Sequence, residues 1–338
     1  MYKISLITGD GIGPELSESV IDVLHTVNDK LGVKVDVTKL EAGDATLKKT
    51  GSALPEATLD TIKKSDACLK APVGESAADV IVVLRRLLDL YANIRPAKSY
   101  PNMPALKENI DMVIVRENTE DLYTGMEFDM GDTSIALRTI SKSASERIAK
   151  YAFMTAEQRN GKRKVTCVHK SNVMKKTDGL FARSCETIAK NYPKITFEQM
   201  YVDACAMNLI RQPESFDVIV TTNLFGDILS DEASQVVGGL GMAPAANIGD
   251  KFALFEPVHG AAFDIAGKQI ANPSSFILSA KMMFEWLGMK NNDKTCYDAA
   301  KKIEDAVYGI VKEGIKTKDI GGNKSTREFT QSVIARIT

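Results

Sequence analysis

The stretch that decides the fold is Met1–Leu31, MYKISLITGDGIGPELSESVIDVLHTVNDKL. Residues 2–8 are rich in apolar side chains, which predicts a short strand, and the glycines of the following GDGIG predict a tight turn. Pro14 and Glu15 suit the first turn of a helix, where a missing N–H costs nothing and a carboxylate meets the positive end of the helix dipole. The apolar residues that follow recur at helical spacing: Leu16, Val20, Val23, Leu24, Val27 and Leu31. The chain therefore opens with a strand, a turn and a helix that buries one face.

The same alternation of strand and helix continues along the chain. Strand-like runs lie at 33–37, 66–73, 111–116, 164–169 and 216–222, and helical runs near 55–65, 80–90, 145–159, 178–191 and 276–288. This pattern predicts an α/β fold with much parallel sheet. Residues 125–140 break it, and we expect antiparallel strands there. Ser143 and Glu146 have the spacing of a capping box at the start of the 145–159 helix.

Composition excludes several classes of protein. The 338 residues, enough for about two domains, include 43 Lys and Arg against 44 Asp and Glu, which argues against a polybasic nucleic-acid binder. No apolar run approaches the roughly 18–20 residues that span a bilayer. The five cysteines are scattered and never spaced as C-x-x-C, which excludes a disulfide framework and favours a reduced, cytoplasmic setting.

Three arginines are candidates for binding a carboxylate ligand. Arg85 and Arg95 lie in LRRLLDLYANIRP, and Arg116 lies at the end of the strand in VIVREN. Guanidinium groups bind carboxylates in a bidentate manner, so three of them in one cleft would suit a di- or tricarboxylate. The alternative is that they are ordinary surface arginines.

Two aspartates are candidates for binding a metal. Asp227 and Asp231 in NLFGDILSDE are four residues apart, which places both carboxylates on one face of a helix. Their mutual repulsion favours a shared cation, and oxygen ligands point to Mg²⁺ or Mn²⁺ rather than zinc. Asp203, an isolated acid in YVDACAMN, gives a weaker signal of the same kind. The alternative is a solvated helix face.

Three further segments are ambiguous by themselves. GDGIGPE lacks the third glycine of the dinucleotide-binding fingerprint, because Pro14 stands there, so a turn that merely allows close packing explains it as well. Lys170 ends the strand of VTCVHK and is either a general acid/base or a surface lysine. Residues 256–273, EPVHGAAFDIAGKQIANP, are rich in small residues that would let a planar ligand approach.

Together these segments resemble one family, the β-decarboxylating 2R-hydroxyacid dehydrogenases, which includes isopropylmalate, isocitrate and homoisocitrate dehydrogenases. The motifs match in order: GDGIGPE, LDLYANIRP, RENTEDLYTG, VHKSNVMKKTDGLF, NLFGDILSDEASQ, GGLGMAPAANIG and EPVHGAAFDIAGKQIANP. The resemblance implies the non-Rossmann fold of that family, in which two α/β domains share a large sheet system. The Pro-rich segment 96–104 and the Gly-rich segment 238–249 then suggest a discontinuous cofactor-binding domain of residues 1–96 and 239–338. Residues 97–238 would form the dimerisation and substrate/metal domain, with an intersubunit arm near 125–140.

The resemblance also implies roles for individual residues. Arg85, Arg95 and Arg116 would hold the carboxylates of a 2-hydroxy di- or tricarboxylate. Asp227, which also contacts the substrate, would bind Mg²⁺ or Mn²⁺ together with Asp231, and with Asp203 supplied by the other subunit. Lys170, also from the other subunit, would help to deprotonate the hydroxyl, and Tyr123 would protonate the enol left after loss of CO₂. Such composite sites require a homodimer or a dimer of dimers.

The same resemblance predicts the cofactor. His259, Gly260, Asp264, Ile265 and Asn272 align with the adenosine-binding loop of the family. An acid followed by Ile resembles the NAD-type members, because the carboxylate accepts hydrogen bonds from both ribose hydroxyls and repels a 2′-phosphate. NAD is therefore expected. Phe263 departs from the family, whose members usually carry Pro there.

The helix before Arg85 bears on the choice of substrate within the family. Ile81 and Val82 lie four and three residues before Arg85, where isopropylmalate enzymes carry apolar side chains, although Ala78 replaces their frequent Glu. An isopropyl group would be buried favourably there, whereas an unpaired carboxylate would be costly. We therefore expect an isopropylmalate substrate and a step of leucine biosynthesis, with isocitrate or homoisocitrate as the alternative. Two alternatives of a different functional class are a catalytically silent regulatory subunit and a Mg²⁺-dependent hydrolase.

Overall fold

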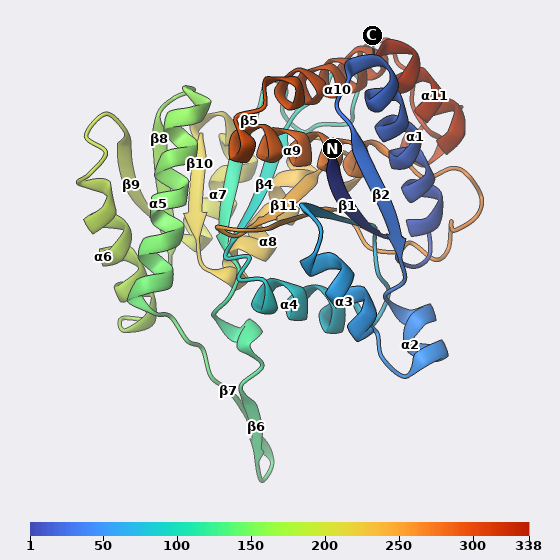
Figure 1. Ribbon diagram of the computed structural model, residues 1–338. Coiled ribbons are helices and arrows are strands. Elements are labelled where there is room, and N and C mark those ends of the chain that lie inside the picture. The colour runs from blue at the N-terminus through green and yellow to red at the C-terminus, as the bar shows by residue number, and fades with distance from the viewer. Residues whose placement is uncertain (338) are drawn as a thin grey trace.

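The computed structural model describes residues 1–337, and its centre is a mixed ten-stranded sheet (Figure 1). In hydrogen-bonding order its strands are β2 (Val35–Leu40), β1 (Tyr2–Ile7), β3 (Ala67–Lys70), β12 (Ala253–Pro257), β11 (Pro244–Ile248), β4 (Ala92–Lys98), β5 (Asp111–Glu117), β10 (Val218–Thr221), β8 (Lys164–His169) and β9 (Thr196–Tyr201). The pairings are parallel except at the centre, where β11 is antiparallel to β12 and β4, and β4 is antiparallel to β5. This is the α/β fold with a large shared sheet that we expected. Residue 338, which ends the first expected domain, lies outside the described residues.

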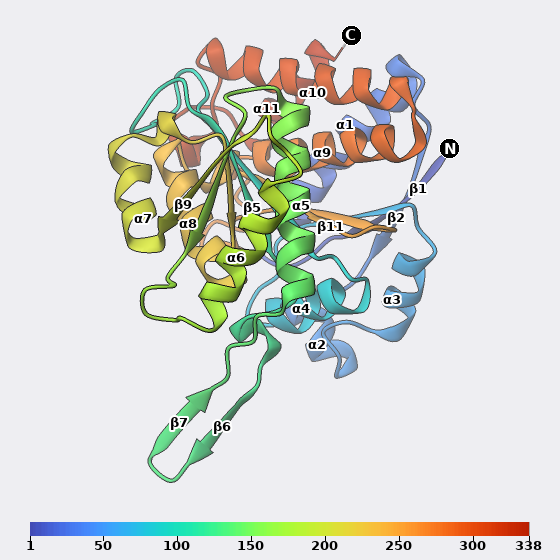
Figure 2. The same ribbon diagram turned by 90° about the vertical axis from the view of Figure 1, so that its left-hand side faces the viewer.

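Helices cover both faces of the sheet (Figures 1 and 2). Those that pack into the largest apolar cluster are α1 (Gly13–Leu31), α5 (Lys142–Arg159), α6 (Thr177–Ala189), α9 (Ser274–Asn291), α10 (Lys294–Lys312) and α11 (Thr326–Arg336). Those on the other face are α2 (Asp44–Thr50), α3 (Glu56–Lys63), α4 (Ala77–Leu87), α7 (Val202–Arg211) and α8 (Asn223–Val236). Short 3₁₀ turns are η1 (Leu122–Thr124), η2 (Pro213–Ser215), η3 (Leu240–Met242) and η4 (Lys318–Ile320). Within residues 1–337, every helix is too short or too polar to cross a bilayer.

Strand alternation separates an apolar face of the central sheet from a polar one. Val113, Val115, Ala246 and Phe255 all point into the largest cluster. The opposite face carries two smaller apolar clusters, one beneath α3 and α4 and one beneath α7 and α8. Between them the central strands present buried polar side chains: Lys70, Asn93, Arg95, Arg116, Asn247 and Glu256. We call these six residues the polar strip.

The glycines of the first turn serve close packing, which is the simpler of the two interpretations of GDGIG. Gly11 has φ +57°, and a Cβ placed on it would lie 2.0 Å from the carbonyl oxygen of Ala261. The N–H of Ile12 donates to that same oxygen at 2.8 Å. The turn therefore fastens the start of α1 to the 256–273 loop, and a side chain at position 11 would displace that loop.

The irregular segment 125–140 forms an antiparallel hairpin, as its sequence predicts. Strands β6 (Glu127–Met130) and β7 (Thr133–Ala136) pair only with each other. The hairpin projects away from the body of the molecule in both views (Figures 1 and 2). Its apolar side chains Met126, Phe128 and Met130 are exposed.

The start of α5 differs from the prediction. The helix begins at Lys142, and its N-cap is Ser141, whose Oγ accepts from the N–H of Ala144 at 3.2 Å. The predicted cap, Ser143, already lies inside the helix, and Glu146 pairs with Lys142 at 3.6 Å. Two serines two residues apart offer alternative caps, and the earlier one adds half a turn of helix.

Candidate active site

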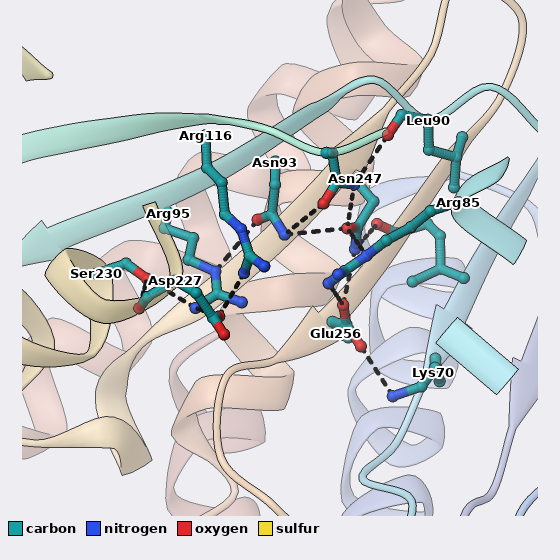
Figure 3. A network of polar contacts seen from close by, with 12 residues as sticks. Lys70, Arg85, Leu90, Asn93, Arg95, Arg116, Asp227, Ser230, Asn247 and Glu256 are labelled. Carbon is teal, nitrogen blue, oxygen red and sulfur yellow. Dashed lines mark hydrogen bonds and ion pairs between the residues drawn. The ribbon is translucent and has the colours of Figure 1, made fainter. Parts of the chain in front are cut away.

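Arg85 lies at one end of the polar strip and is held by an amide and a carboxylate (Figure 3). Its Nε donates to Oδ1 of Asn247 at 2.9 Å, and its Nη2 lies 3.2 Å from Oε1 of Glu256. The other oxygen of Glu256 pairs with Nζ of Lys70 at 2.8 Å. Burial alone would raise the pKa of Glu256, but Lys70 and Arg85 lower it to about 2. Glu256 is therefore a permanent anion that fixes Arg85 within the protein.

Asn247 connects Arg85 to the rest of the strip. Its Oδ1 also accepts from Nδ2 of Asn93 at 3.2 Å and from Nδ2 of Asn118 at 3.0 Å. Asn93 in turn accepts from Nε of Arg95 at 3.3 Å. All of these side chains are buried, so this hydrogen-bonded chain sets the orientation of Arg85 relative to Arg95.

Arg95 extends from β4 toward helix α8. Its Nη1 donates to Oγ of Ser230 at 2.7 Å and lies 3.2 Å from Asp231 and 3.4 Å from Asp227. Burial and the neighbouring Arg116 lower the pKa of Arg95 to about 10. Besides burial, the neighbouring charges of Arg116 and Arg85 contribute to this shift, and such a concentration of positive charge favours an anionic ligand.

Arg116 is the most deeply buried of the three arginines, at 1% exposed. Its Nε donates to Oδ1 of Asn223 at 2.9 Å, and its Nη1 pairs with Asp227. Its Nη2 is buried and has no hydrogen-bond partner within residues 1–337. An unpaired buried guanidinium N–H is costly, so a ligand that accepts a hydrogen bond from it would bind favourably.

Tyr123, on η1, completes the cluster around Asp227. Its Oη donates to Oδ2 of Asp227 at 2.5 Å, and its ring lies 5.0 Å from the Arg116 guanidinium. Burial raises the pKa of Tyr123; Arg116 opposes this shift, and the hydrogen bond to Asp227 adds to it. The phenol is therefore protonated at neutral pH and can donate a proton.

Asp227 and Asp231 lie on the same face of α8, as their spacing predicts. Burial alone would raise the pKa of Asp227, but Arg116 and Arg95 hold it below its usual value. Burial raises the pKa of Asp231 against the effect of Arg95. Both side chains keep solvent-facing surface, at 39% and 56% exposed, where a cation has access. Within residues 1–337 no three His, Cys, Asp or Glu side chains are grouped as a metal would require.

Lys170 and Asp203 lie together but apart from this cluster. Nζ of Lys170 and Oδ1 of Asp203 are 2.5 Å apart. Lys170 directly follows β8, and Asp203 follows β9 by two residues. No hydrogen bond or ion pair in the described part of the chain joins either of them to Asp227. A role beside Asp227 in the same chain therefore has no support in this structure.

The loop after β12 holds the residues expected to bind the cofactor. His259 Nδ1 lies 3.1 Å from the carbonyl oxygen of Gly260, while its Nε2 is buried without a partner within residues 1–337. Burial lowers the pKa of His259, so its ring is neutral at pH 7. Asp264 is exposed, Ile265 packs against the largest cluster, and Asn272 donates to the carbonyl of Gly241 at 3.2 Å. The buried Nε2 and the open space around Gly260 fit a ligand at this loop.

The two apolar residues expected to contact the substrate differ in exposure. Ile81 is 9% exposed and belongs to the apolar cluster beneath α3 and α4, while Val82 is half-buried against the same cluster. Both lie within one turn of Arg85, on its side of α4. Packing explains Ile81 by itself, and only Val82 keeps appreciable exposed surface.

Local sequence patterns do not indicate the residues that support the arginines. These are Lys70, Asn93, Asn118, Asn247, Ser230 and Glu256. Signals existed in two places, because Asn247 interrupts the apolar run PAANI and Glu256 ends the apolar run ALFE. A polar residue inside a buried strand requires a partner, and the partner here is an arginine.

The Glu256→Gln variant tests this buried ion network through its dependence on pH. The folded-state pKa of about 2 lies below the ordinary value near 4.5, so the ionised carboxylate stabilises the fold above pH 4.5. That contribution, about 3 kcal/mol, is lost as pH falls from 4.5 toward 2. Urea titrations of both proteins measure this, and the stability difference between the wild type and Glu256→Gln is expected to shrink by about 2 kcal/mol from pH 7 to pH 3. A constant difference between the two proteins would contradict the assignment.

The fold is α/β, and the cluster groups three buried arginines with two carboxylates, an arrangement suited to an anionic ligand. The family model described as isocitrate/isopropylmalate dehydrogenase matches residues 3–333, and the chain belongs to this family of oxidoreductases. A protein named 3-isopropylmalate dehydrogenase from Archaeoglobus fulgidus is 52% identical over 333 residues, 98% of each chain. Another of that name, from Sulfurisphaera tokodaii, is 50% identical over 338 residues, 99% of each chain.

A solved structure matches the fold over the whole length. The crystal structure of isocitrate dehydrogenase from Methylococcus capsulatus has a TM-score of 0.93 and 42% identity, covering 100% of this chain and 99% of that chain. The comparisons therefore agree with the resemblance inferred from the seven motifs.

Proposed function

We propose that the chain oxidises and decarboxylates (2R,3S)-3-isopropylmalate to 4-methyl-2-oxopentanoate and CO₂, a cytoplasmic step of leucine biosynthesis that uses NAD⁺ and Mg²⁺ or Mn²⁺. The observation that carries the proposal is the buried cluster of Arg85, Arg95 and Arg116, with one guanidinium N–H unpaired beside Asp227 and Tyr123. The names of the archaeal relatives support the choice of substrate.

The three arginines bind the two substrate carboxylates. Arg116 offers the free Nη2, and burial and the charge of Arg116 lower the pKa of Arg95 to about 10, so an incoming carboxylate relieves the repulsion between them. Arg85 keeps its position through Asn247 and Glu256 whether or not substrate is bound. The cluster is therefore preorganised for a dianion.

Asp227 and Asp231 would hold the divalent cation with oxygen ligands, and Asp203 of the partner subunit would complete the set. The donor set fits Mg²⁺ or Mn²⁺, and the two solvent-facing carboxylates of one chain need a third ligand from elsewhere. When bound, the cation acts as a Lewis acid that stabilises negative charge developing on the substrate oxygen.

Two residues move protons at opposite ends of the reaction. Lys170 of the partner subunit takes the proton of the C2 hydroxyl as hydride leaves C2. Tyr123 then protonates the carbon from which CO₂ has departed, since its phenol is kept protonated by burial and by Asp227. In each chain Lys170 directly follows β8, and Tyr123 lies on η1, which follows β5.

The 256–273 loop would bind NAD, with His259, Gly260 and Asn272 holding the adenosine and Asp264 accepting from the ribose hydroxyls. The double variant Asp264→Lys/Ile265→Tyr is expected to lower kcat/KM for NAD⁺ at least tenfold and to raise that for NADP⁺, because an ammonium replaces the carboxylate that repels a 2′-phosphate. Steady-state kinetics with both cofactors measure the change. Lys268→Ala, an exposed change in the same loop, is the control. Unaltered NAD⁺ kinetics in the double variant would place the cofactor elsewhere.

Exposed apolar side chains support a homodimer with shared sites. Large apolar side chains stay exposed on the hairpin and on α7 and α8: Met126, Phe128, Met130, Met207, Ile210 and Ile228. Exposed apolar patches of this kind mark interfaces between proteins. The proposed division into residues 1–96 with 239–338, and 97–238, assigns all six to the dimerisation domain.

Relative kcat/KM values for isopropylmalate, isocitrate and homoisocitrate, with NAD⁺ and Mg²⁺, test the proposed substrate. Val82, the more exposed of the two apolar residues before Arg85, favours the isopropyl group, since an isocitrate carboxylate buried against it would lack a partner. We expect isopropylmalate to be preferred by at least tenfold. A preference for either tricarboxylate would overturn the assignment, and no NADH formation with any of the three would favour a silent subunit.

A further inference from the structure

Arg138, between the hairpin and α5, lies where three parts of the chain meet. These are η1, α8 and the segment after β8, which carry Tyr123, Asp227 and Lys170. Its guanidinium is nearly buried, with 12% of the side chain exposed. It forms ion pairs with Asp121 and Asp178, both fully buried, and donates to Oγ1 of Thr222 at 2.8 Å. Its face lies 4.8 Å from the ring of Phe225. None of these contacts reaches the substrate cluster directly.

The contact with Asp121 connects Arg138 to Tyr123 and Asp227 of its own chain. Arg138 Nε lies 2.6 Å from Oδ1 of Asp121. The same carboxylate accepts from the N–H of Leu122, which starts η1, and from the N–H of Leu224, in the first turn of α8. η1 carries Tyr123 and α8 carries Asp227, so Asp121 fixes both relative to one guanidinium. Asp121 itself has φ +71°, a conformation that is costly for a residue with a side chain and that the surrounding contacts have to maintain.

The contact with Asp178 connects Arg138 to Lys170. Arg138 Nη1 lies 2.6 Å from Oδ1 of Asp178, and the other oxygen of Asp178 accepts from the backbone N–H of Lys170 at 2.6 Å. The backbone of Lys170 is therefore one carboxylate away from Arg138. In the proposed dimer this lysine serves the neighbouring active site, not that of its own chain.

The charges explain why one arginine suffices for two buried aspartates. Asp178 lies in the first turn of α6, and Asp121 accepts from the first turn of α8, so each carboxylate faces the positive end of a helix dipole. Backbone N–H donors satisfy the oxygens that Arg138 leaves free. Only a planar fork can contact Asp121, Asp178 and Thr222 at once; a lysine ammonium keeps the charge but not this geometry.

We propose that Arg138 is a positioning residue that serves two active sites at once, setting Tyr123 and Asp227 for its own site and Lys170 for the site of the partner. The inference rests on the shared sites of the proposed function. It predicts that a single change at Arg138 impairs both sites of a dimer, although Arg138 touches no ligand.

Hybrid dimers separate the two directions. One chain carries Lys170→Met and the other Asp227→Asn, with different affinity tags for purification of the mixed dimer. Either homodimer is expected to be almost inactive, while the hybrid retains one complete site and about half of the wild-type activity. A hybrid as inactive as its parents would overturn the shared sites before Arg138 is tested, whereas failure of the proposed reaction would appear as wild-type protein that does not oxidise isopropylmalate.

Arg138→Lys is then placed on one chain of the hybrid at a time. On the Lys170→Met chain it disturbs Tyr123 and Asp227 of the working site, and on the Asp227→Asn chain it disturbs the Lys170 that reaches that site. Each placement is expected to lower kcat by roughly 10²-fold, the effect of displacing a catalytic group by about 1 Å. The melting temperature checks that both hybrids stay folded. An effect from only one placement, or from neither, would overturn the proposal.

Asp178→Asn supplies a second test that does not depend on the fold of the Arg138 variant. It weakens only the connection to Lys170, so it is expected to lower kcat on the Asp227→Asn chain and to leave kcat within about twofold on the Lys170→Met chain. An equal loss from both placements would mean general destabilisation and would contradict the directional role.

Arg159 is the matched control for Arg138. It also bridges two aspartates, with Nη2 2.8 Å from Asp111 and Nε 3.2 Å from Asp217. Those aspartates stand at the amino ends of β5 and β10, whereas Arg138 lies beyond their carboxyl ends. Arg159→Lys removes the same kind of fork at the opposite ends of the same strands. Hybrid dimers that carry Arg159→Lys are expected to keep the activity of the parent hybrid. A loss equal to that of Arg138→Lys would assign the effect to loss of a guanidinium bridge between two aspartates as such.

Discussion

The Asp227→Asn variant is expected to lose roughly 10³-fold in kcat, with its fold preserved. One carboxylate receives Arg116 and Arg95 at Oδ1 and the Tyr123 phenol at Oδ2. An asparagine offers one oxygen and one NH₂ in the same space, so either the phenol or Arg116 meets a donor in place of an acceptor. The variant also removes one of the two charges proposed to hold the divalent cation.

Glu232→Gln, one residue after Asp231 on the same helix, is the control for Asp227→Asn. It removes the same charge, but Glu232 forms no ion pair within residues 1–337. Steady-state kinetics at saturating Mg²⁺ and circular dichroism compare the two variants. If Asp227→Asn keeps more than a tenth of the wild-type kcat, Asp227 is not the centre of the site.

The Gly226→Ala variant is expected to lower kcat/KM by roughly 10²-fold, although alanine favours helix over glycine by about 1 kcal/mol. A Cβ at position 226 of α8 would lie 2.4 Å from Cγ and 2.6 Å from Cβ of Arg116. Arg116 is fixed in β5 at the centre of the sheet, so the helix has to move outward and carry Asp227 with it. The free energy of unfolding is expected to fall by about 2 kcal/mol, which is typical of overpacking.

Gly309→Ala separates close packing from helix propensity. Position 309 is also a glycine inside a helix, α10, but its new Cβ would meet only Nη1 of Arg336 at 2.8 Å, the far end of a flexible side chain. We expect unchanged kinetics and equal or higher stability, measured by thermal and urea unfolding. Wild-type kinetics in Gly226→Ala would show that Arg116 can shift without loss of function.

The sequence predicted the elements whose local pattern agrees with their final surroundings. β1 follows from its run of apolar residues and α1 from helical spacing, and NLFGDILSDE, which carries the paired aspartates, was expected to be the helix α8. β4 was not predicted, because ANIRPAK contains Asn, Arg, Pro and Lys, which local propensity excludes from a buried strand. Those polar residues are tolerated because Asn93 and Arg95 have partners on other strands, and no local pattern reveals partners that lie 130 residues or more away.

The candidate site divides in the same way. The arginines and aspartates that face a ligand stand in recognisable motifs, so their types and spacing indicated their chemistry. The residues that orient them do not: Asn247 and Arg138 are single polar residues whose importance comes only from the sheet order and the hairpin base. Those depend on long-range packing of segments that one-dimensional periodicity does not relate.

The order of the strands also affects how the protein is made. β3 ends at Lys70 and β4 at Lys98, yet the strands that lie between them, β11 and β12, begin only at Pro244. At 5–20 residues per second a ribosome needs roughly 7–30 s to cross that interval. During this time the partner edges of β3 and β4 are synthesised but unpaired, while β5, β8, β9 and β10 can already pair with one another. Two open sheet edges of the nascent chain are therefore exposed to aggregation until β11 and β12 are made. We expect the yield of soluble protein to improve when expression is carried out at lower temperature or with a chaperone that shields such edges.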